Sequence, residues 1–249
     1  MKIVVIGGTS LIGKQVVANL SKSGHDVVPA SPSLGINSKT GKGIAKTLKG
    51  ADVLIDTTNA TSFMPDEVMD FFVSSTINLI QSAKSASIIH YIVLSVTGTE
   101  RDDANAYYIA KRVQENLVVY SGIPFSIVHA TQLFEFIPGI TESGLVGDEF
   151  YLPPAHFQPV ASAEVAELLS EIAGGVPVNR IISIVGPEKL CIDDSARKYL
   201  SFKKDKRKVI TDNNANYFET KATTKPHVPA GVVIIGNMNY EEWLGEQGA

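Results

Sequence analysis

Three glycines near the start of the chain, Gly7, Gly8 and Gly13, have a spacing that suits phosphate binding. They follow an apolar run at residues 2–6, which predicts a buried strand, and they lead into a segment with helical spacing. A glycine-rich turn between a strand and a helix brings backbone N–H groups and the helix N-terminus against a phosphate. We therefore expect this turn to bind the pyrophosphate of a dinucleotide through Gly7, Gly8, Thr9, Ser10, Leu11, Ile12 and Gly13.

Ser10 stands where a second motif glycine often falls. Its side chain either obstructs the pyrophosphate or donates a hydrogen bond to it through the hydroxyl, and the sequence leaves both alternatives open. A purely structural turn without a ligand is the third interpretation.

The end of the second predicted strand bears on the choice between NAD and NADP. Sites for NAD usually have an acid there, which accepts hydrogen bonds from the ribose hydroxyls and repels a 2′-phosphate. In this chain Asp26 lies at the start of that strand, whereas Ser31 and Ser33 follow its end. Hydroxyls can bind a 2′-phosphate, and Lys39 or Lys42 can add charge, so the sequence favours NADP as cofactor while NAD stays open.

Short apolar runs that predict strands alternate with segments of helical spacing. The strands are expected at residues 2–6, 25–30, 51–57, 90–96, 125–130 and 180–185, with helices after Gly13 up to Gly24, at 66–86, at 107–121 and from Ser162, as N-cap, to Ile172. Runs without polar alternation are typical of strands covered on both faces. The pattern predicts an α/β fold with a doubly wound parallel sheet of the Rossmann type.

After about residue 130 the alternation loosens, because prolines and glycines interrupt the segment 133–160. We expect a dinucleotide-binding core at 1–130 and a smaller, loop-rich substrate lobe at 131–249, partly interleaved with the core. A last strand is expected at 232–235. Aromatic side chains in the lobe either bind an apolar substrate or pack the lobe itself. The candidates for substrate binding are Phe134, Phe136 and Tyr151.

Composition excludes several classes of partner. The 249 residues carry a formal net charge of −4, so there is no global basic field for nucleic acid or an anionic membrane. The single cysteine, Cys191, permits no internal disulfide, and no apolar run approaches membrane-spanning length. We expect a cytoplasmic protein, monomer or homodimer, that binds a small-molecule substrate and no metal, nucleic acid or membrane.

Several motifs together resemble the short-chain dehydrogenase/reductase superfamily, and in particular its atypical, NmrA-like branch of NAD(P)-binding proteins. The motifs are IGGTSLIG at the start, DTTNA at 56–60, LSVTGTE at 94–100, YYIAK at 107–111 and SGIPFSIVHATQLFEF at 121–136. The resemblance extends over nearly the whole chain. It implies a nucleotide bound across the carboxyl ends of the strands.

In active members of that superfamily a serine, a tyrosine and a lysine act together, and the resemblance maps these roles onto Ser95, Tyr107 and Lys111. Ser95 ends a predicted strand, and Tyr107 and Lys111 lie four residues apart, on one face of the following helix. The lysine is expected to lower the tyrosine pKa, the phenol to transfer a proton as hydride moves, and the serine to orient a carbonyl. The Tyr-x-x-x-Lys spacing occurs three times in the chain, so it is the position after a central strand that selects Tyr107.

Three further positions are candidates for the site. His129 stands where relatives commonly have arginine, and it either faces the site or is a hydrogen-bonded histidine at a strand end. Thr58 and Asn59, after the strand at 51–57, are candidate cofactor contacts.

The sequence thus supports a first hypothesis, an NAD(P)H-dependent oxidoreductase that reduces a small carbonyl, quinone or related unsaturated compound. The alternative is a non-catalytic, NAD(P)-sensing regulatory protein. A sugar-nucleotide epimerase is a weaker third candidate, because the part after residue 130 is short for a nucleotide-sugar lobe.

Overall fold

A computed structural model describes residues 1–62, 64–101, 105–217, 220–221 and 232–248. The chain divides into two compact units. Unit 1 comprises Met1–His129 and Ala163–Ile182, and unit 2 comprises Ala130–Ser162 and Ser183–Ala249.

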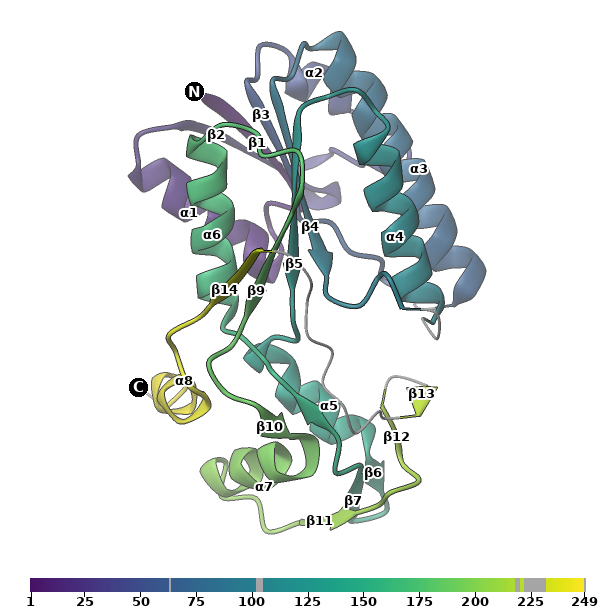
Figure 1. Cartoon of the computed structure of the whole chain (residues 1–249), viewed down its shortest axis with the longest axis vertical. Helices are drawn as coiled ribbons and strands as arrows, with labels where there is room; N and C mark the ends of the chain where they lie inside the picture. The colour runs from purple at the N-terminus through teal and green to yellow at the C-terminus, as the bar shows by residue number, and fades with distance from the viewer. Residues whose placement is uncertain (63, 102–104, 218–219, 222–231, 249) are drawn as a thin grey trace. The chain divides into compact units, whose positions relative to one another are not determined.

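Unit 1 is built mainly from alternating strands and helices, with α1 and α6 on one face of its sheet and α2, α3 and α4 on the other (Figure 1). In chain order the elements are β1 (Lys2–Ile6), α1 (Leu11–Lys22), β2 (Asp26–Ala30), the 3-10 turn η1 (Pro32–Leu34), α2 (Ile44–Leu48), β3 (Val53–Asp56), α3 (Pro65–Ser85), β4 (His90–Val96), α4 (Ala106–Val119), β5 (Phe125–Ala130), α6 (Ser162–Gly174) and β9 (Ile181–Val185). With β14 (Val232–Ile235) the main sheet has the order β14-β9-β5-β4-β3-β1-β2. This is the predicted doubly wound α/β fold of the Rossmann type.

The register of the sheet brings strand ends that are far apart in sequence to one edge. β1 pairs in parallel with both β2 and β3, so that Ile6 lies opposite Ala30 and Asp56. β3 pairs in parallel with β4, where Asp56 lies opposite Val93. The glycine turn, the residues after β2 and β3, and the end of β4 therefore share the carboxyl edge of the sheet, where doubly wound folds bind ligands.

Apolar side chains on both faces of the strands form the core of unit 1. Val4, Leu54 and Tyr91 are fully buried in one cluster with Leu79 of α3 and Val118 of α4. The uninterrupted apolar runs of the strands therefore reflect burial under helices on both sides.

The predicted elements differ from the observed ones mainly at their ends. The strand expected at 51–57 is β3, at 53–56, and the helices expected at 66–86 and 107–121 are α3, at 65–85, and α4, at 106–119. The helix expected from Ser162 to Ile172 is α6, at 162–174. Ser162 is the first residue of α6, and its hydroxyl donates to Glu135 Oε1 at 2.6 Å.

Unit 2 has its own core and smaller sheets. Its elements are η2 (Phe134–Phe136), α5 (Ile137–Ser143), β6 (Leu145–Val146), β7 (Glu149–Leu152), β8 (His156–Phe157), β10 (Leu190–Cys191), α7 (Ile192–Phe202), β11 (Lys208–Thr211), β12 (Asn216–Tyr217), β13 (Thr220–Lys221) and α8 (Tyr240–Glu246), together with the end of β9 and β14. The ring of Phe134 stacks on that of Tyr240, with centroids 5.5 Å apart, and lies 5.8 Å from that of Trp243. These aromatic side chains anchor α8 to the core of the unit.

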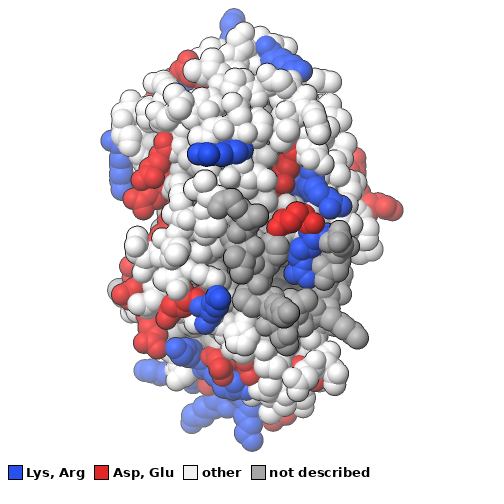
Figure 2. All heavy atoms as spheres, viewed as in Figure 1, with Lys and Arg blue, Asp and Glu red and all other residues white. Residues whose placement is uncertain are grey.

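The surface is of mixed charge on the face shown in Figure 2, where Lys and Arg are interspersed with Asp and Glu. Within the described part of the chain, no helix combines the length and apolar character needed to cross a membrane.

Candidate active site

The glycine turn between β1 and α1 has room for backbone only. Gly7 has a φ of +80°, which favours glycine, and a Cβ added to Gly13 would lie 2.1 Å from the carbonyl oxygen of Gly7. A Cβ on Gly8 would lie 2.9 Å from the carbonyl oxygen of Val5. Any larger residue at these positions would displace the turn, so the three glycines are required by close backbone approach.

Ser10 is the N-cap of α1, and its hydroxyl oxygen accepts a hydrogen bond from the N–H of Gly13 at 3.1 Å. The side chain is thus engaged in capping the helix. The first N–H groups of a helix have no partner within the helix, so the N-terminus of α1 is suited to bind an anion. The turn therefore fits the pyrophosphate of a dinucleotide, and Ser10 is compatible with that function.

The residues after β2 provide hydroxyl groups at the same edge. Ser31 is buried, and its Oγ lies 2.8 Å from the Oγ of the exposed Ser33, within hydrogen-bond distance. Lys39 forms an exposed ion pair with Asp70 at 2.8 Å. Of the two lysines expected to add charge here, Lys39 thus has a carboxylate partner on α3, and Lys42 is exposed.

Tyr107 lies in the first turn of α4, whose N-cap Asn105 accepts from the N–H of Tyr108 at 3.2 Å. Its ring stands edge-on to that of Phe72, with centroids 5.9 Å apart. Burial raises the pKa of the Tyr107 phenol well above its ordinary value, the charge of Tyr108 acts in the same direction, and a hydrogen bond with the side chain of Asn59 opposes them. The phenol is therefore protonated at neutral pH.

Lys111, one helical turn further along α4, is buried, with 2% of its surface exposed. Its Nζ donates to the carbonyl oxygen of Leu94 at 2.8 Å and to Oε1 of Gln114, and lies 4.6 Å from the centre of the Phe72 ring. Desolvation lowers the pKa of this ammonium to about 8, although the nearby carboxylates of Asp56 and Glu115 oppose the shift.

Asp56, the last residue of β3, is a buried acid that is connected to Lys111 through the side chain of Gln114. Its Oδ2 accepts from Gln114 Nε2 at 3.1 Å and from the Tyr91 hydroxyl at 3.3 Å, and its Oδ1 accepts from the N–H and hydroxyl of Thr58 at 2.9 and 2.7 Å. Burial raises the pKa of the Asp56 carboxyl, while the hydrogen bonds from Thr58 and the charge of Lys111 oppose that rise. Gln114 therefore links the only described acid of β3 to the ammonium of α4.

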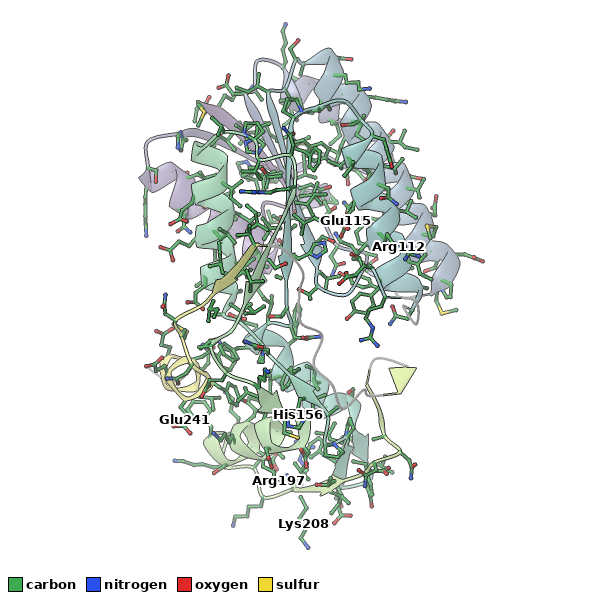
Figure 3. All side chains as sticks on the ribbon, in the orientation of Figure 1. Arg112, Glu115, His156, Arg197, Lys208 and Glu241 are labelled. Carbon is green, nitrogen blue, oxygen red and sulfur yellow. The ribbon has the colours of Figure 1, made fainter. Side chains whose placement is uncertain are left out.

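Glu115 forms a second buried cluster with side chains of β4, of the segment after β4 and of β5. Its Oε1 accepts from the Ser95 hydroxyl and lies 2.9 Å from Nε2 of His129, while its Oε2 accepts from the Thr99 hydroxyl at 3.2 Å. Figure 3 shows Glu115 on the side of α4 that faces the sheet. Of the two interpretations of His129, the structure gives the hydrogen-bonded histidine at the end of β5.

The three predicted catalytic residues lie on β4 and α4, and each has a partner of its own. Ser95 bonds Glu115, Tyr107 bonds Asn59, and Lys111 bonds Leu94 and Gln114. The pKa of Tyr107 is raised, whereas the resemblance led us to expect that the lysine lowers it. Tyr107 and Lys111 share contact with the ring of Phe72.

Sequence reasoning missed three polar residues of this region: Asp56, Gln114 and Glu115. A signal for Glu115 was available, because it lies four residues after Lys111 and so on the same helix face. A carboxylate at the end of the apolar run 53–55 was the corresponding signal for Asp56.

The substrate candidates belong to unit 2. Phe134 is fully buried in the core of that unit, Phe136 is 47% exposed, and the Tyr151 hydroxyl donates to Glu149 at 3.2 Å. Phe136 and Tyr151 thus have surface available to a ligand, and the ring of Phe134 is used for packing.

Comparison with known proteins gives both a family and a fold. Residues 36–174, more than half of the chain, match the family described as NAD(P)H-binding. A comparison with curated protein sequences gives no match.

Among solved structures, the chain is similar to UDP-glucose 4-epimerase from Thermotoga maritima with UDP-glucose, with a TM-score of 0.74, 12% identity, and coverage of 92% of this chain and 90% of that one. It is similar to dTDP-4-dehydrorhamnose reductase from Bacillus anthracis in complex with NADP, with a TM-score of 0.69, 14% identity, and coverage of 98% and 92%. MoeE5 in complex with UDP-glucose and NAD gives a TM-score of 0.72, 13% identity, and coverage of 98% and 92%.

At such identities these structures show a common fold, and the family match shows the cofactor. The glycine turn, the N-terminus of α1 and the shared carboxyl edge fit that cofactor. The chain belongs to the family described as NAD(P)H-binding, which supports the resemblance to the atypical branch of the short-chain dehydrogenase/reductase superfamily.

Proposed function

We propose that the protein is an NADPH-dependent reductase that acts on a small carbonyl, quinone or related unsaturated compound. The observation that carries the proposal is the pairing of a protonated phenol, Tyr107, with a buried ammonium, Lys111, one turn apart on α4. Both follow β4, whose end shares the carboxyl edge of the sheet with the glycine turn.

When bound, the reduced dinucleotide supplies a hydride to the carbonyl carbon. Tyr107 donates its phenolic proton to the carbonyl oxygen, so that C=O becomes CH–OH, and the phenol later regains a proton from water. Lys111 provides positive charge close to the developing oxyanion and phenolate, in surroundings where desolvation strengthens the interaction. Ser95, the residue after Leu94 on β4, binds the substrate.

The test is NADPH consumption with a panel of aldehydes, ketones and quinones, for the wild type and Tyr107→Phe. Loss of the proton donor is expected to lower kcat by about 100-fold or more. Tyr120→Phe is the matched control, because Tyr120 follows the same helix and is 86% exposed. Equal rates for wild type and Tyr107→Phe would remove the assigned role.

A second candidate function is a nucleotide-sensing regulator that binds NAD(P) without turnover. The observation that favours it is that Ser95, Tyr107 and Lys111 each bond a different partner. This candidate predicts tight dinucleotide binding, no reduction of any compound in the panel, and a protein partner whose affinity differs between the oxidised and reduced cofactor.

We also propose that NADPH is preferred over NADH. The support is the hydroxyl pair of Ser31 and Ser33 after β2, where an NAD-specific site would carry an acid. Thr58 and Asn59, after β3, are proposed as further contacts to the cofactor; Asn59 would be held in place by its hydrogen bond with Tyr107.

A further inference from the structure

Glu115 is a buried carboxylate that the proposed mechanism does not use. It is 6% exposed and receives hydrogen bonds from β4 and from the segment after it, through Ser95 and Thr99. Its contact with His129 Nε2 adds a third group, from β5. A carboxylate without such partners would be costly to bury, and here both oxygens are bonded.

The contact between Ser95 and Glu115 has a defined direction. A carboxylate accepts hydrogen bonds and donates none, so the single hydrogen of the Ser95 hydroxyl points to Oε1 of Glu115. Only lone pairs of the Ser95 oxygen then remain for a ligand. In this state Ser95 cannot donate to a carbonyl oxygen, which is the function that the family resemblance implied.

We propose that Glu115 is a positioning residue that turns Ser95 into a hydrogen-bond acceptor, and that the substrate therefore carries a hydroxyl group next to its reacting carbonyl. This inference rests on the proposed reductase function. The substrate hydroxyl donates to Ser95, and the carbonyl oxygen is left to Tyr107. The substrate class is thereby narrowed to α-hydroxy carbonyl compounds.

A matched pair of ketones tests the inference. Hydroxyacetone and butan-2-one differ in one group, a hydroxyl against a methyl, next to the same carbonyl. The ratio of their kcat/KM values, with NADPH as reductant, reports whether the protein recognises that hydroxyl. In the wild type the ratio is expected to favour hydroxyacetone by about tenfold, the value of one satisfied hydrogen bond.

Two variants separate the contributions of acceptor and positioning residue. Ser95→Ala removes the acceptor, and the ratio is expected to fall close to one. Glu115→Leu keeps a side chain of similar size but accepts no hydrogen bond; it frees the Ser95 hydrogen to point at the carbonyl, and the ratio is expected to fall as well. The matched control is Ser126→Ala, which removes a buried serine hydroxyl of β5 that bonds His90 and should leave the ratio unchanged.

A second measurement tests the contact itself without any turnover. In a double-mutant cycle on the free energy of unfolding, Ser95→Ala and Glu115→Leu are expected to be non-additive, because each removes the same hydrogen bond. Additive effects would overturn the inference. So would a wild-type ratio near one, or a ratio that stays high in Ser95→Ala.

Failure of the inference differs from failure of the proposed function. If the wild type oxidises NADPH with quinones but with neither ketone, the inference is overturned and the reductase function stands. If it oxidises NADPH with no compound of the panel, the proposed function fails and this inference fails with it.

Discussion

Nζ of Lys111 donates a hydrogen bond to the backbone carbonyl oxygen of Leu94 at 2.8 Å, and so joins the buried side of α4 to the end of β4. The residue after Leu94 is Ser95, and the acid beside Ser95 is Glu115 of the same helix. One helix face therefore holds both the ammonium and the carboxylate that act at the end of this strand.

The charge of Lys111 is expected to set the alkaline limit of activity. Because its pKa is lowered to about 8, the ammonium loses its proton as pH rises through that value, and kcat/KM should fall there. The charge of Asp56 raises the pKa of Lys111, so in Asp56→Asn the alkaline fall in kcat/KM should occur at a pH lower by roughly one unit. The measurement is the pH profile of NADPH-dependent reduction. The exposed Asp70→Asn is the control, and identical profiles for wild type and Asp56→Asn would contradict the assignment.

His90 should make the protein acid-sensitive. Burial lowers its pKa from 6.5 to about 4, so the unfolded chain binds the extra proton more readily between these values. Stability is then fully present above about pH 6.5 and declines as pH falls to about 4, by about 3 kcal/mol. Urea unfolding across this range should give a flatter dependence for His90→Gln than for the wild type or for His25→Gln, a variant at a partly exposed histidine before β2. If the free energy of unfolding changed with pH equally in His90→Gln and in the wild type, protonation of His90 would not be the cause of the acid sensitivity.

Gly13→Ala should disrupt both the fold and the cofactor site. The new Cβ would meet the Gly7 carbonyl oxygen at 2.1 Å, so the turn must shift, with an expected loss of at least about 2 kcal/mol of unfolding free energy. Fluorescence titration should then show no NADPH binding. In Gly174→Ala the new Cβ would meet nothing within 4 Å beyond its own stretch of helix, so binding should be retained and stability raised by up to about 1 kcal/mol. Normal NADPH affinity in Gly13→Ala would refute the pyrophosphate site.

Ser33→Asp should weaken NADPH binding by roughly tenfold and leave NADH binding equal or stronger. A carboxylate after β2 accepts from ribose hydroxyls and repels a 2′-phosphate. Paired titrations with the two cofactors measure the change, with Ser23→Asp, at the C-cap of α1, as the control for an added charge. If the ratio of the NADPH and NADH affinities did not change, the adenosine ribose would not bind beside Ser33.

The fold could be predicted from the sequence because its signals are local. The apolar runs of β1 and β4 and the spacing of apolar residues in α3 and α4 identify the elements to within a few residues. Ser162 shows what local reasoning does not reach: its hydroxyl donates to Glu135, which lies 27 residues away in the chain.

The sequence by itself determined the strand–turn–helix with its three glycines, the alternation that gives the doubly wound sheet, and the spacing of Tyr107 and Lys111 on one helix face. All of these depend on residues near each other in the chain. Only the tertiary structure decided what surrounds them: Gln114 is 58 residues from Asp56, and Glu115 is 20 residues from Ser95. The physical reason is that helix packing and sheet register bring these groups together out of water. The lowered pKa of Lys111 and the direction of the Ser95 hydrogen bond follow from that burial and from the partners it selects.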